Sequence, residues 1–465
     1  MKRLLCTILV AAMMLSMFLL PACNKKNDPA ATQGTTLPSD TSPRDPTKTP
    51  TDPTDEPTDP VDPTDPTDPT ETPTDPTEAP TEAPTEAPTE APTEAPTQPK
   101  PTDPPATEPP TEPPTEPPTE PPTEPAHISI LGPTGEVFPY VDNAKKYLLE
   151  GGDVGRYTFP ATKTGVKPIE IKWKADFTPS EFVVRYGTDE SFTTYKEVIV
   201  PGTQKTISVY NLLKAATYYV QVSAVDDAGK EHVATSTFQT TSMGPRVILV
   251  EGAYNIRDVG GYTTSFGKTT LQNMVFRGDA LLKDEFSYAN ITEEGKRVMS
   301  EDLGIKLEID VRSPNYGTTS VIPGAARKYC TLGGYGDAFS SPGGYIALFK
   351  ELAKVESYPV YIHCSGGADR TGTVCFLLNA LLGVDEKTLI QDYEFTTFSD
   401  YGTRSTKSGA YYINFMTFYS TLKSYEGDTL PEKVESYLKH FGVTQAEIDA
   451  IRGIMFGEIP VPSAE

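Results

Sequence analysis

A cysteine and an arginine, separated by five residues, lie where an apolar strand gives way to an apolar helix. Residues 359–372 read Pro-Val-Tyr-Ile-His-Cys-Ser-Gly-Gly-Ala-Asp-Arg-Thr-Gly, so Cys364 follows the strand and Arg370 opens the helix. The two glycines allow backbone amides to approach an anion from one concave side. The helix start adds free amides and the positive end of its dipole. The groups expected to bind phosphate are those of Ser365, Gly366, Gly367, Ala368 and Arg370.

The chemistry expected of this loop is attack by a thiolate on phosphorus. A helix N-terminus favours the thiolate form of a cysteine, so Cys364 is the predicted nucleophile. Arg370 offers a planar fork that binds two phosphoryl oxygens and stays charged. Thr371 can donate its hydroxyl to the thiolate and help the sulfur leave in a second step. A structural cysteine before an ordinary glycine turn would not explain why these features occur together with His363.

The run His-Cys-x-x-Gly-x-x-Arg-Thr-Gly resembles the signature of cysteine-dependent phosphatases. Residues 255–262, Asn-Ile-Arg-Asp-Val-Gly-Gly-Tyr, resemble a motif of bacterial tyrosine phosphatases related to secreted lipid-and-tyrosine phosphatases. Residues 276–281, 310–313 and 392–393 fit the same family in order, and the resemblance spans about residues 247–457. It implies a cysteine-phosphatase fold. It also implies hydrolysis of a phosphorylated protein or another phosphate ester through a phosphocysteine.

The same resemblance places the general acid within the loop, at Asp369. Asp310 is the second candidate, and a purely structural pairing of Asp310 with Arg312 or Arg257 is an equal alternative. The residues expected to support the loop rather than to react are His363, Asn255, Arg257 and Asp258. His, Cys and carboxylate side chains form no cluster at ligand spacing, so we expect no metal and no cofactor.

One loop position departs from the family pattern, because Ala368 stands where a lysine is usual. In the family this lysine is linked to the handling of extra phosphates on inositol lipids. We expect the Ala368 side chain at the rim of the loop, where its lack of charge favours monophosphates such as phosphotyrosine. Two alternatives stay open. The substrate could be a phosphoinositide or inositol phosphate, or the protein could be a catalytically inert surface protein that only binds.

The elements that must position this loop predict an α/β fold. The runs predicted as strands are residues 247–250, 306–311 and 360–363, and the predicted helices follow Thr292, Pro342 and Gly366. A helical block runs from about residue 409 and contains a capping-box spacing at Thr444 and Glu447. Strands that alternate with helices argue for a mostly parallel sheet flanked by helices, within a catalytic domain over residues 242–460.

Residues 166–241 show short runs in which apolar and polar residues alternate. The clearest run, Ile-Glu-Ile-Lys-Trp at residues 169–173, predicts a half-buried strand with Trp173 in a core. Residues 213–229 resemble the end of a fibronectin type III domain. We therefore expect an all-β sandwich of that type, with a glycan or a protein as its ligand. Residues 127–165 could join the sandwich as extra strands.

The chain begins with an export signal. Lys2 and Arg3 precede an apolar run, and Leu-Pro-Ala-Cys at residues 20–23 resembles a bacterial lipobox. We expect residues 1–22 to be removed as a lipoprotein signal peptide and Cys23 to carry lipid. A retained spanning segment is the alternative. Both predict an extracytoplasmic protein, and the lipobox predicts a lipid anchor in the bacterial cell membrane.

Residues 23–126 consist largely of Thr, Pro, Asp and Glu and leave almost nothing to bury, so we expect a disordered stalk. Residues 24–126 carry about −18 of the formal net charge of −24. The remainder is only mildly acidic and has no basic stripe, which argues against nucleic acid as a partner. Three cysteines remain in the folded part, an odd number, and Cys375 is predicted to be a buried core residue.

Overall fold

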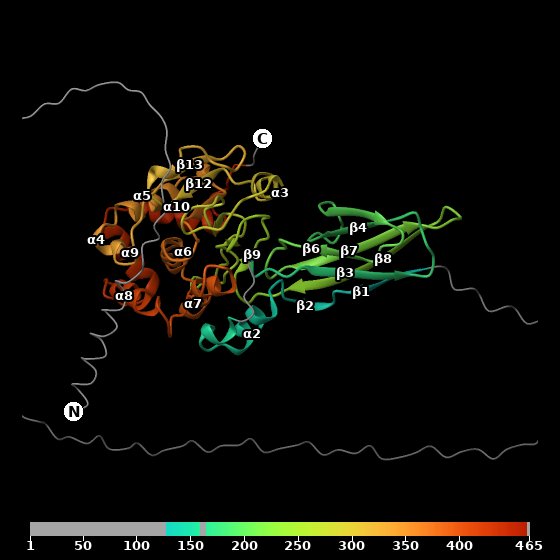
Figure 1. Ribbon diagram of the computed structural model, residues 1–465, viewed down its shortest axis with the longest axis horizontal. Coiled ribbons are helices and arrows are strands. Elements are labelled where there is room, and N and C mark those ends of the chain that lie inside the picture. Colours follow the sequence, from blue (N-terminus) through green and yellow to red (C-terminus); the bar gives the residue numbers. More distant parts are fainter. Residues whose placement is uncertain (1–126, 159–163, 463–465) are drawn as a thin grey trace, which may run out of the picture. The chain divides into compact units, whose positions relative to one another are not determined.

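The computed structural model describes residues 127–158 and 164–462. The predicted signal peptide, the lipidated Cys23 and the stalk lie outside these residues. Among the residues described, no helix combines the length and the apolar character needed to cross a membrane. These residues contain an all-β region and an α/β region (Figure 1).

The all-β region is a sandwich of two sheets. One has the order β1-β3-β6 and the other β2-β8-β7-β4-β5, and only β2 and β8 pair in parallel. The strands are β1 Ile128–Gly132, β2 Gly135–Val137, β3 Ile169–Ala175, β4 Glu181–Gly187, β5 Lys196–Pro201, β6 Thr206–Val209, β7 Thr217–Val225 and β8 Glu231–Thr240. In β3, Ile171 and Trp173 are buried and Lys172 between them is exposed, which is the predicted alternation.

The segment between β2 and β3 leaves the sandwich. β1 and β2 add strands as expected, but residues 142–157 are helical, as α2 Asp142–Glu150 and the 3-10 turn η1 Val154–Tyr157. Tyr147 of α2 packs in a cluster with Phe395 and Phe398 of the α/β region. The expectation of strands is wrong here. The buried residues Ala144, Tyr147 and Leu148 recur at helical spacing, which gives one apolar face to a helix and none to a strand.

A six-stranded sheet of order β13-β12-β14-β11-β10-β9 forms the centre of the α/β region. The strands are β9 Arg246–Val247, β10 Arg257–Asp258, β11 Val275–Gly278, β12 Leu307–Asp310, β13 Ala326–Tyr329 and β14 Val360–His363. β13, β12, β14 and β11 are parallel, while β10 and β9 are antiparallel additions at one edge. The register places Asp310, His363 and Gly278 side by side where the parallel strands end.

Helices cover both faces of this sheet, as expected for a mixed α/β fold. They are α3 Glu293–Arg297 with the π-helical turn η2 Val298–Asp302, α4 Asp337–Ser340, α5 Gly343–Leu352, α6 Arg370–Leu381, α7 Glu386–Glu394, α8 Tyr412–Lys423, α9 Leu430–His440 and α10 Gln445–Met455. Three 3-10 turns complete the region: η3 Pro314–Tyr316, η4 Val355–Ser357 and η5 Phe395–Phe398. Ile362 packs in the larger core with α6, and Tyr361 packs in the core on the other face.

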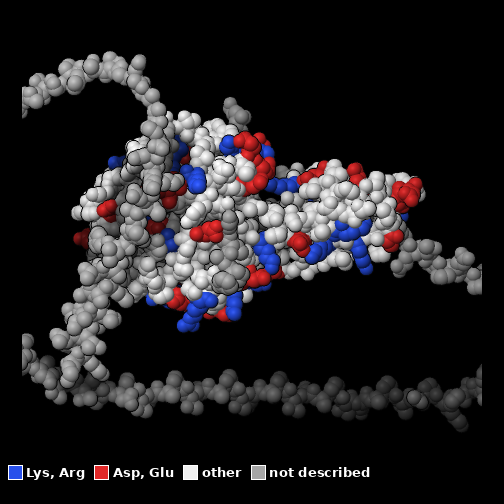
Figure 2. Space-filling model, in the orientation of Figure 1, with Lys and Arg blue, Asp and Glu red and all other residues white. Residues whose placement is uncertain are grey.

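Helix α6 is buried along its whole length except at Arg370, which makes it the central helix. Near the C-terminus, Thr444 and Glu447 form the predicted capping box at the start of α10. On the face drawn in Figure 2, acidic and basic side chains are interspersed, and no continuous basic stripe crosses the described surface in this view.

Candidate active site

The loop of residues 364–369 joins the end of β14 to the start of α6. Its carbonyl oxygens are held from the outside of the loop. The bonds run from Asn255 Nδ2 to Gly366 O (2.9 Å), from Arg277 Nη2 to Gly367 O (2.8 Å) and from the Ala280 amide to Ser365 O (3.0 Å). Because these carbonyls are fixed outward, the amides between them are left to face the concave side.

The amide groups of residues 365–369 have no acceptor within the described part of the chain. Gly367 has a φ of +64°, and a Cβ there would lie 2.2 Å from the carbonyl oxygen of Gly278, so only glycine fits. Unsatisfied amides that converge on one concavity at a helix N-terminus form a binding site for an anion. This loop is the one that the sequence predicts to bind phosphate.

Cys364 and Arg370 lie at the two ends of this loop. Cys364 is a free thiol and only 4% exposed. Arg370 is partly exposed, and the structure records no hydrogen bond or ion pair to its guanidinium from any described residue. The loop therefore combines free amide donors with an uncommitted cation, which suits a doubly charged ligand.

Asp369 belongs to the same loop, and both oxygens of its carboxylate accept hydrogen bonds. Arg404 Nε donates to Asp369 Oδ1 at 2.7 Å and Arg404 Nη2 donates to Oδ2 at 3.0 Å, which is a bidentate ion pair. The hydroxyl of Tyr335 donates to Oδ1 at 2.6 Å. The side chain is 30% exposed, so it lies at the solvent side of the loop.

Asp310 is held differently from Asp369, in a buried cluster of cations. It accepts hydrogen bonds from Arg312 and is paired with Arg327. Although burial opposes ionisation, Arg312 and the nearby His363 hold the pKa of Asp310 down at about 2. A carboxylate held in this way is a poor proton donor near neutral pH. The arrangement matches the structural pairing with Arg312, and the alternative pairing with Arg257 does not occur.

His363 links the loop to the neighbouring strand. Its Nδ1 lies 3.0 Å from Cys364 O, and its Nε2 lies 2.8 Å from Glu308 Oε1. Burial opposes ionisation of Glu308, but the hydrogen bond from His363 keeps the pKa of Glu308 below its ordinary value. The ring is therefore fixed at both nitrogens, which suits the predicted role of orienting the loop.

Of the supporting residues predicted from the N-terminal motif, Asn255 contacts the loop directly and Arg257 is connected to it through Asn255. Arg257 hydrogen bonds the side chain of Asn255, which holds Gly366, and it also donates to Asp392. Asp258 does not contact the loop and pairs instead with Arg246. The expected buttressing by Asp258 is wrong because successive side chains on a strand point to opposite faces.

Two further expectations differ from the structure. Ala368 is 2% exposed, so it is not at an open rim. Arg277 Nη2 also lies 3.4 Å from the Ala368 carbonyl oxygen. The hydroxyl of Thr371 is buried without a hydrogen-bond partner among the described residues, so the expected bond to Cys364 is not formed.

Four residues of the site were not assigned a role from the sequence. They are Arg277, Asp392, Arg404 and Asp284. Asp392 binds both Arg257 and Arg277, and so connects two cations that support the loop. Two of the four lie in the family-like runs at residues 276–281 and 392–393, which was the available signal. Arg404 and Asp284 have no local pattern that distinguishes them from surface charges.

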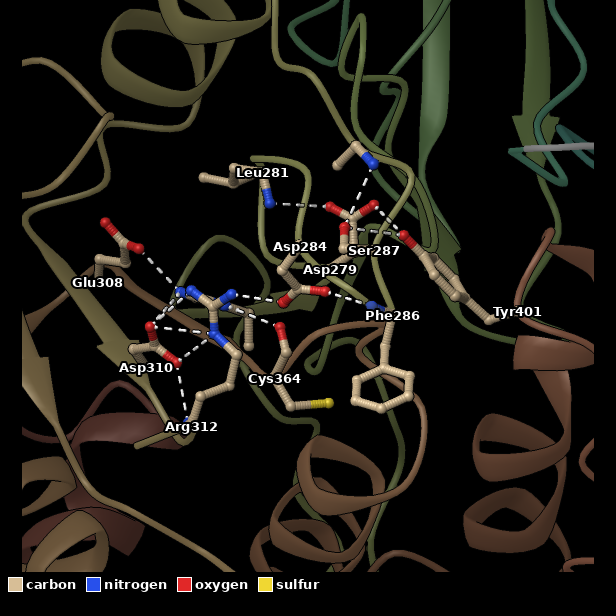
Figure 3. Close-up of polar contacts among 12 residues, drawn as sticks. Asp279, Leu281, Asp284, Phe286, Ser287, Glu308, Asp310, Arg312, Cys364 and Tyr401 are labelled. Carbon is tan, nitrogen blue, oxygen red and sulfur yellow. Dashed lines mark hydrogen bonds and ion pairs between the residues drawn. The ribbon is translucent and has the colours of Figure 1, made fainter. Parts of the chain in front are cut away.

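One wall beside Cys364 is formed by residues 284–288. Asp284 accepts hydrogen bonds from Arg312 Nη1 at 2.6 Å and from the amide of Phe286 at 2.7 Å. These bonds hold Phe286, whose ring is 65% exposed, and Figure 3 shows the sulfur of Cys364 pointing to the side where this ring lies. Tyr288 is equally exposed and stacks on Tyr401. Residues 284–288 thus carry two exposed aromatic side chains, and one of them, Phe286, lies on the side to which the sulfur of Cys364 points in Figure 3.

Asp279 lies behind this wall and predicts a pH dependence of stability. It accepts hydrogen bonds from Tyr401 and from two backbone amides, and burial raises its pKa to about 7 (Figure 3). An unfolded aspartate titrates near pH 4, so the folded protein retains a proton that the unfolded chain has released between about pH 4 and 7. This contribution to stability is complete below about pH 4 and is lost as the pH rises through 7.

The asparagine of Asp279→Asn cannot ionise, so this variant should not show the loss of folding stability between about pH 4 and 7. The free energy of unfolding of Asp279→Asn, relative to wild type, should rise by about 2 to 3 kcal/mol between pH 5 and pH 8. Denaturant unfolding at both pH values measures the change. Asp227→Asn, at an exposed turn, is the matched control. An equal difference from wild type at both pH values would contradict the prediction.

Comparison with known proteins gives one family match. Residues 248–457 match the sequence model of the tyrosine phosphatase family. None of the curated proteins compared matches the chain. In the part of the chain that the structure describes, no group of three or more His, Cys, Asp or Glu side chains could hold a metal ion.

Solved structures similar to this chain include two types of domain. The fn3 domain of the human collagen alpha-1(XX) chain is 25% identical, with 16% of this chain and 71% of that chain covered and a TM-score of 0.15. The core catalytic domain of a PP-IP phosphatase from S. cerevisiae, in complex with citrate, is 12% identical, with coverages of 37% and 88% and a TM-score of 0.23. From the family match, the chain is a protein-tyrosine phosphatase over residues 248–457, an enzyme of the phosphoric monoester hydrolases.

Proposed function

We propose that the chain is a surface-anchored phosphatase that hydrolyses phosphotyrosine in proteins through a phosphocysteine intermediate. The observation that carries the proposal is the loop of residues 364–370. Its amides and the guanidinium of Arg370, which have no partner among the residues described, can bind the oxygens of a phosphate, and Cys364 lies at the start of the same loop. A phosphate dianion would satisfy both sets of donors.

In the first step the thiolate of Cys364 attacks phosphorus, so an S–P bond forms as the bond from phosphorus to the tyrosine oxygen breaks. The leaving oxygen takes a proton from Asp369. Arg370 and the loop amides hold the equatorial oxygens as charge builds on them. In the second step Asp369 accepts a proton from water, the water oxygen attacks phosphorus, and the S–P bond breaks to release phosphate and the thiolate.

The position of Asp369 suits a general acid better than the position of Asp310 does. Asp369 lies in the loop at the solvent side, where a leaving group would depart, whereas Asp310 is buried between two arginines. The hydroxyl of Tyr335 and the fork of Arg404 keep that carboxylate oriented.

The aromatic wall favours an aryl phosphate over an inositol phosphate. The exposed ring of Phe286 offers a flat apolar surface beside Cys364, which can stack on the phenyl ring of phosphotyrosine. An inositol ring, edged with hydroxyls and phosphates, gains little from such a surface. Ala368 adds no charge that would reward a second phosphate group.

A phosphotyrosine peptide and a panel of inositol phosphates test this preference. We expect a higher kcat/KM for the peptide, and Phe286→Ala should lower that value about five- to tenfold, the scale of one aromatic pair. The same variant should leave inositol phosphate turnover within about twofold of wild type. Phe266→Ala, an exposed ring packed near Phe456, is the matched control. A wild-type preference for inositol phosphates would favour the lipid-phosphatase alternative, and turnover of neither class would favour an inert binding protein.

The anchor and the sandwich complete the proposal. The lipobox at residues 20–23 supports lipidation of Cys23 and a location outside the cytoplasmic membrane. The proline-rich residues 23–126 support a stalk, and the fibronectin-like sandwich supports binding of a surface glycan or protein. Labelling of cells with a fatty acid tests the anchor, because label should enter the wild-type protein and not Cys23→Ala.

A further inference from the structure

The helical segment of residues 142–157 contacts the catalytic region at residues 405–408 and at Glu394, the last residue of α7. The hydroxyl of Tyr147 donates to Glu394, Asp153 accepts from Ser405 at 2.8 Å and from Ser408 at 2.7 Å, and Lys407 Nζ donates to the Gly152 carbonyl at 3.0 Å. This segment lies outside the residues that match the tyrosine phosphatase family.

All of these contacts converge on residues 404–408. Glu394 is buried and bridges the two parts, since it binds Tyr147 through Oε2 and binds the amide and hydroxyl of Thr406 through Oε1, at 2.7 and 2.8 Å. Asp153 holds the hydroxyls on either side of Lys407. Residues 405–408 are thus held directly by Asp153 and the Gly152 carbonyl, and through Glu394 by Tyr147.

Arg404 begins this loop and connects it to the active site. Its guanidinium binds both oxygens of Asp369, donates to Tyr401 O at 2.8 Å and lies 3.6 Å from the ring centre of Tyr411. The residue is only 6% exposed. Since its Nε, Nη1 and Nη2 atoms all donate to protein acceptors, the position of the loop backbone sets the position of the guanidinium.

The orientation of Asp369 therefore depends on the segment that holds the loop. The carboxylate has two side-chain partners, Arg404 and Tyr335, and only Arg404 contacts both of its oxygens. A proton donor must be placed to within a fraction of an ångström of the leaving oxygen, and a displacement of about 1 Å can cost about 10²-fold in rate. If residues 404–408 were held less firmly, the Arg404–Asp369 ion pair would transmit the displacement to the carboxylate of Asp369.

We propose that residues 142–157 form a positioning segment that holds Arg404, and through it Asp369, in place for transfer of a proton to the leaving group. The inference rests on the proposed function, in which Asp369 is that donor. Arg404 is a positioning residue, because it contacts Asp369 and not the reacting atoms.

The test compares two substrates with the whole protein and uses kcat/KM, which reports the steps up to phosphoryl transfer. Phosphotyrosine releases a strongly basic phenolate and needs the proton, whereas p-nitrophenyl phosphate releases a weak base and needs it little. Arg404→Lys, which loses the fork, should lower kcat/KM on phosphotyrosine about 10- to 30-fold and on p-nitrophenyl phosphate less than about threefold.

A second variant changes the helical segment itself, away from the active site. Tyr147→Phe combined with Asp153→Ala removes the hydroxyl at Glu394 and both serine contacts. It should lower kcat/KM on phosphotyrosine about three- to tenfold, again with little change on p-nitrophenyl phosphate. Tyr157→Phe is the matched control, because its hydroxyl bonds Gly151 O within the segment itself and not the catalytic loop.

The outcomes separate the two proposals. Equal losses on both substrates, or no loss in the double variant, would overturn the positioning role while leaving the phosphatase assignment standing. A wild-type protein inactive on both substrates would overturn the proposed function and the positioning role together. If Arg404→Lys does not fold, the double variant at the distant contacts decides the matter.

Discussion

Cys364→Ser is expected to abolish phosphate-ester hydrolysis while binding of phosphate or vanadate persists. Serine has no ionised form near neutral pH that could replace the thiolate, so turnover should fall by at least about 10⁴-fold. The amides of residues 365–369 and the guanidinium of Arg370 are unchanged by the substitution and should still bind the anion. Single-turnover assays and calorimetry with vanadate measure the two properties separately.

The two other cysteines of the catalytic region supply the control. Burial raises the pKa of Cys330 and of Cys375 to about 11, so neither is a thiolate at neutral pH. Cys330→Ser should therefore keep substantial turnover. Wild-type-like hydrolysis by Cys364→Ser would remove Cys364 from the mechanism.

Arg370→Lys should cost about 10²- to 10³-fold in kcat/KM, although both side chains are cationic. An ammonium is a point charge that cannot make the two parallel contacts of a guanidinium with two phosphoryl oxygens. The structure records no other partner for Arg370 among the described residues, so the loss should appear in catalysis and hardly in stability. Steady-state kinetics and thermal unfolding together measure this.

Arg297→Lys is the control that shows whether the loss of kcat/KM depends on the position of Arg370 in the active site. Arg297 makes surface ion pairs at the end of α3, and its replacement should leave kcat/KM unchanged. A rate for Arg370→Lys within a few-fold of wild type would show that the guanidinium does not bind the phosphate.

The parts of the fold that follow local rules could be predicted from the sequence. The alternation at residues 169–173 gave the correct burial for Trp173, and the spacing of Thr444 and Glu447 gave the start of α10. The loop was predictable for the same reason. A strand, two glycines and a helix start within residues 359–372 determine one local shape, and they carry Cys364 and Arg370 with it.

The parts that depend on distant partners could not be predicted in this way. Asp369 and Arg404 are 35 residues apart, and nothing near either residue indicates the other. Ala368 was expected at the rim of the loop because the related phosphatases usually present a lysine there. The burial of this residue and the outward hold on the loop carbonyls come from folded partners such as Arg277 and Asn255. Asp258 was misplaced for a simpler reason, since the strand β10 had not been recognised.

The path of the chain between β2 and β3 has a consequence for how the molecule unfolds. The chain leaves the sandwich, packs Tyr147 against Phe395 and Phe398, and returns to the sandwich before it enters the catalytic region. Unfolding of either part alone would break up this apolar cluster, because five of its eight buried residues come from residues 140–154 and three from the catalytic region. All described residues belong to one compact unit, so calorimetry should show a single cooperative endotherm rather than two separate ones.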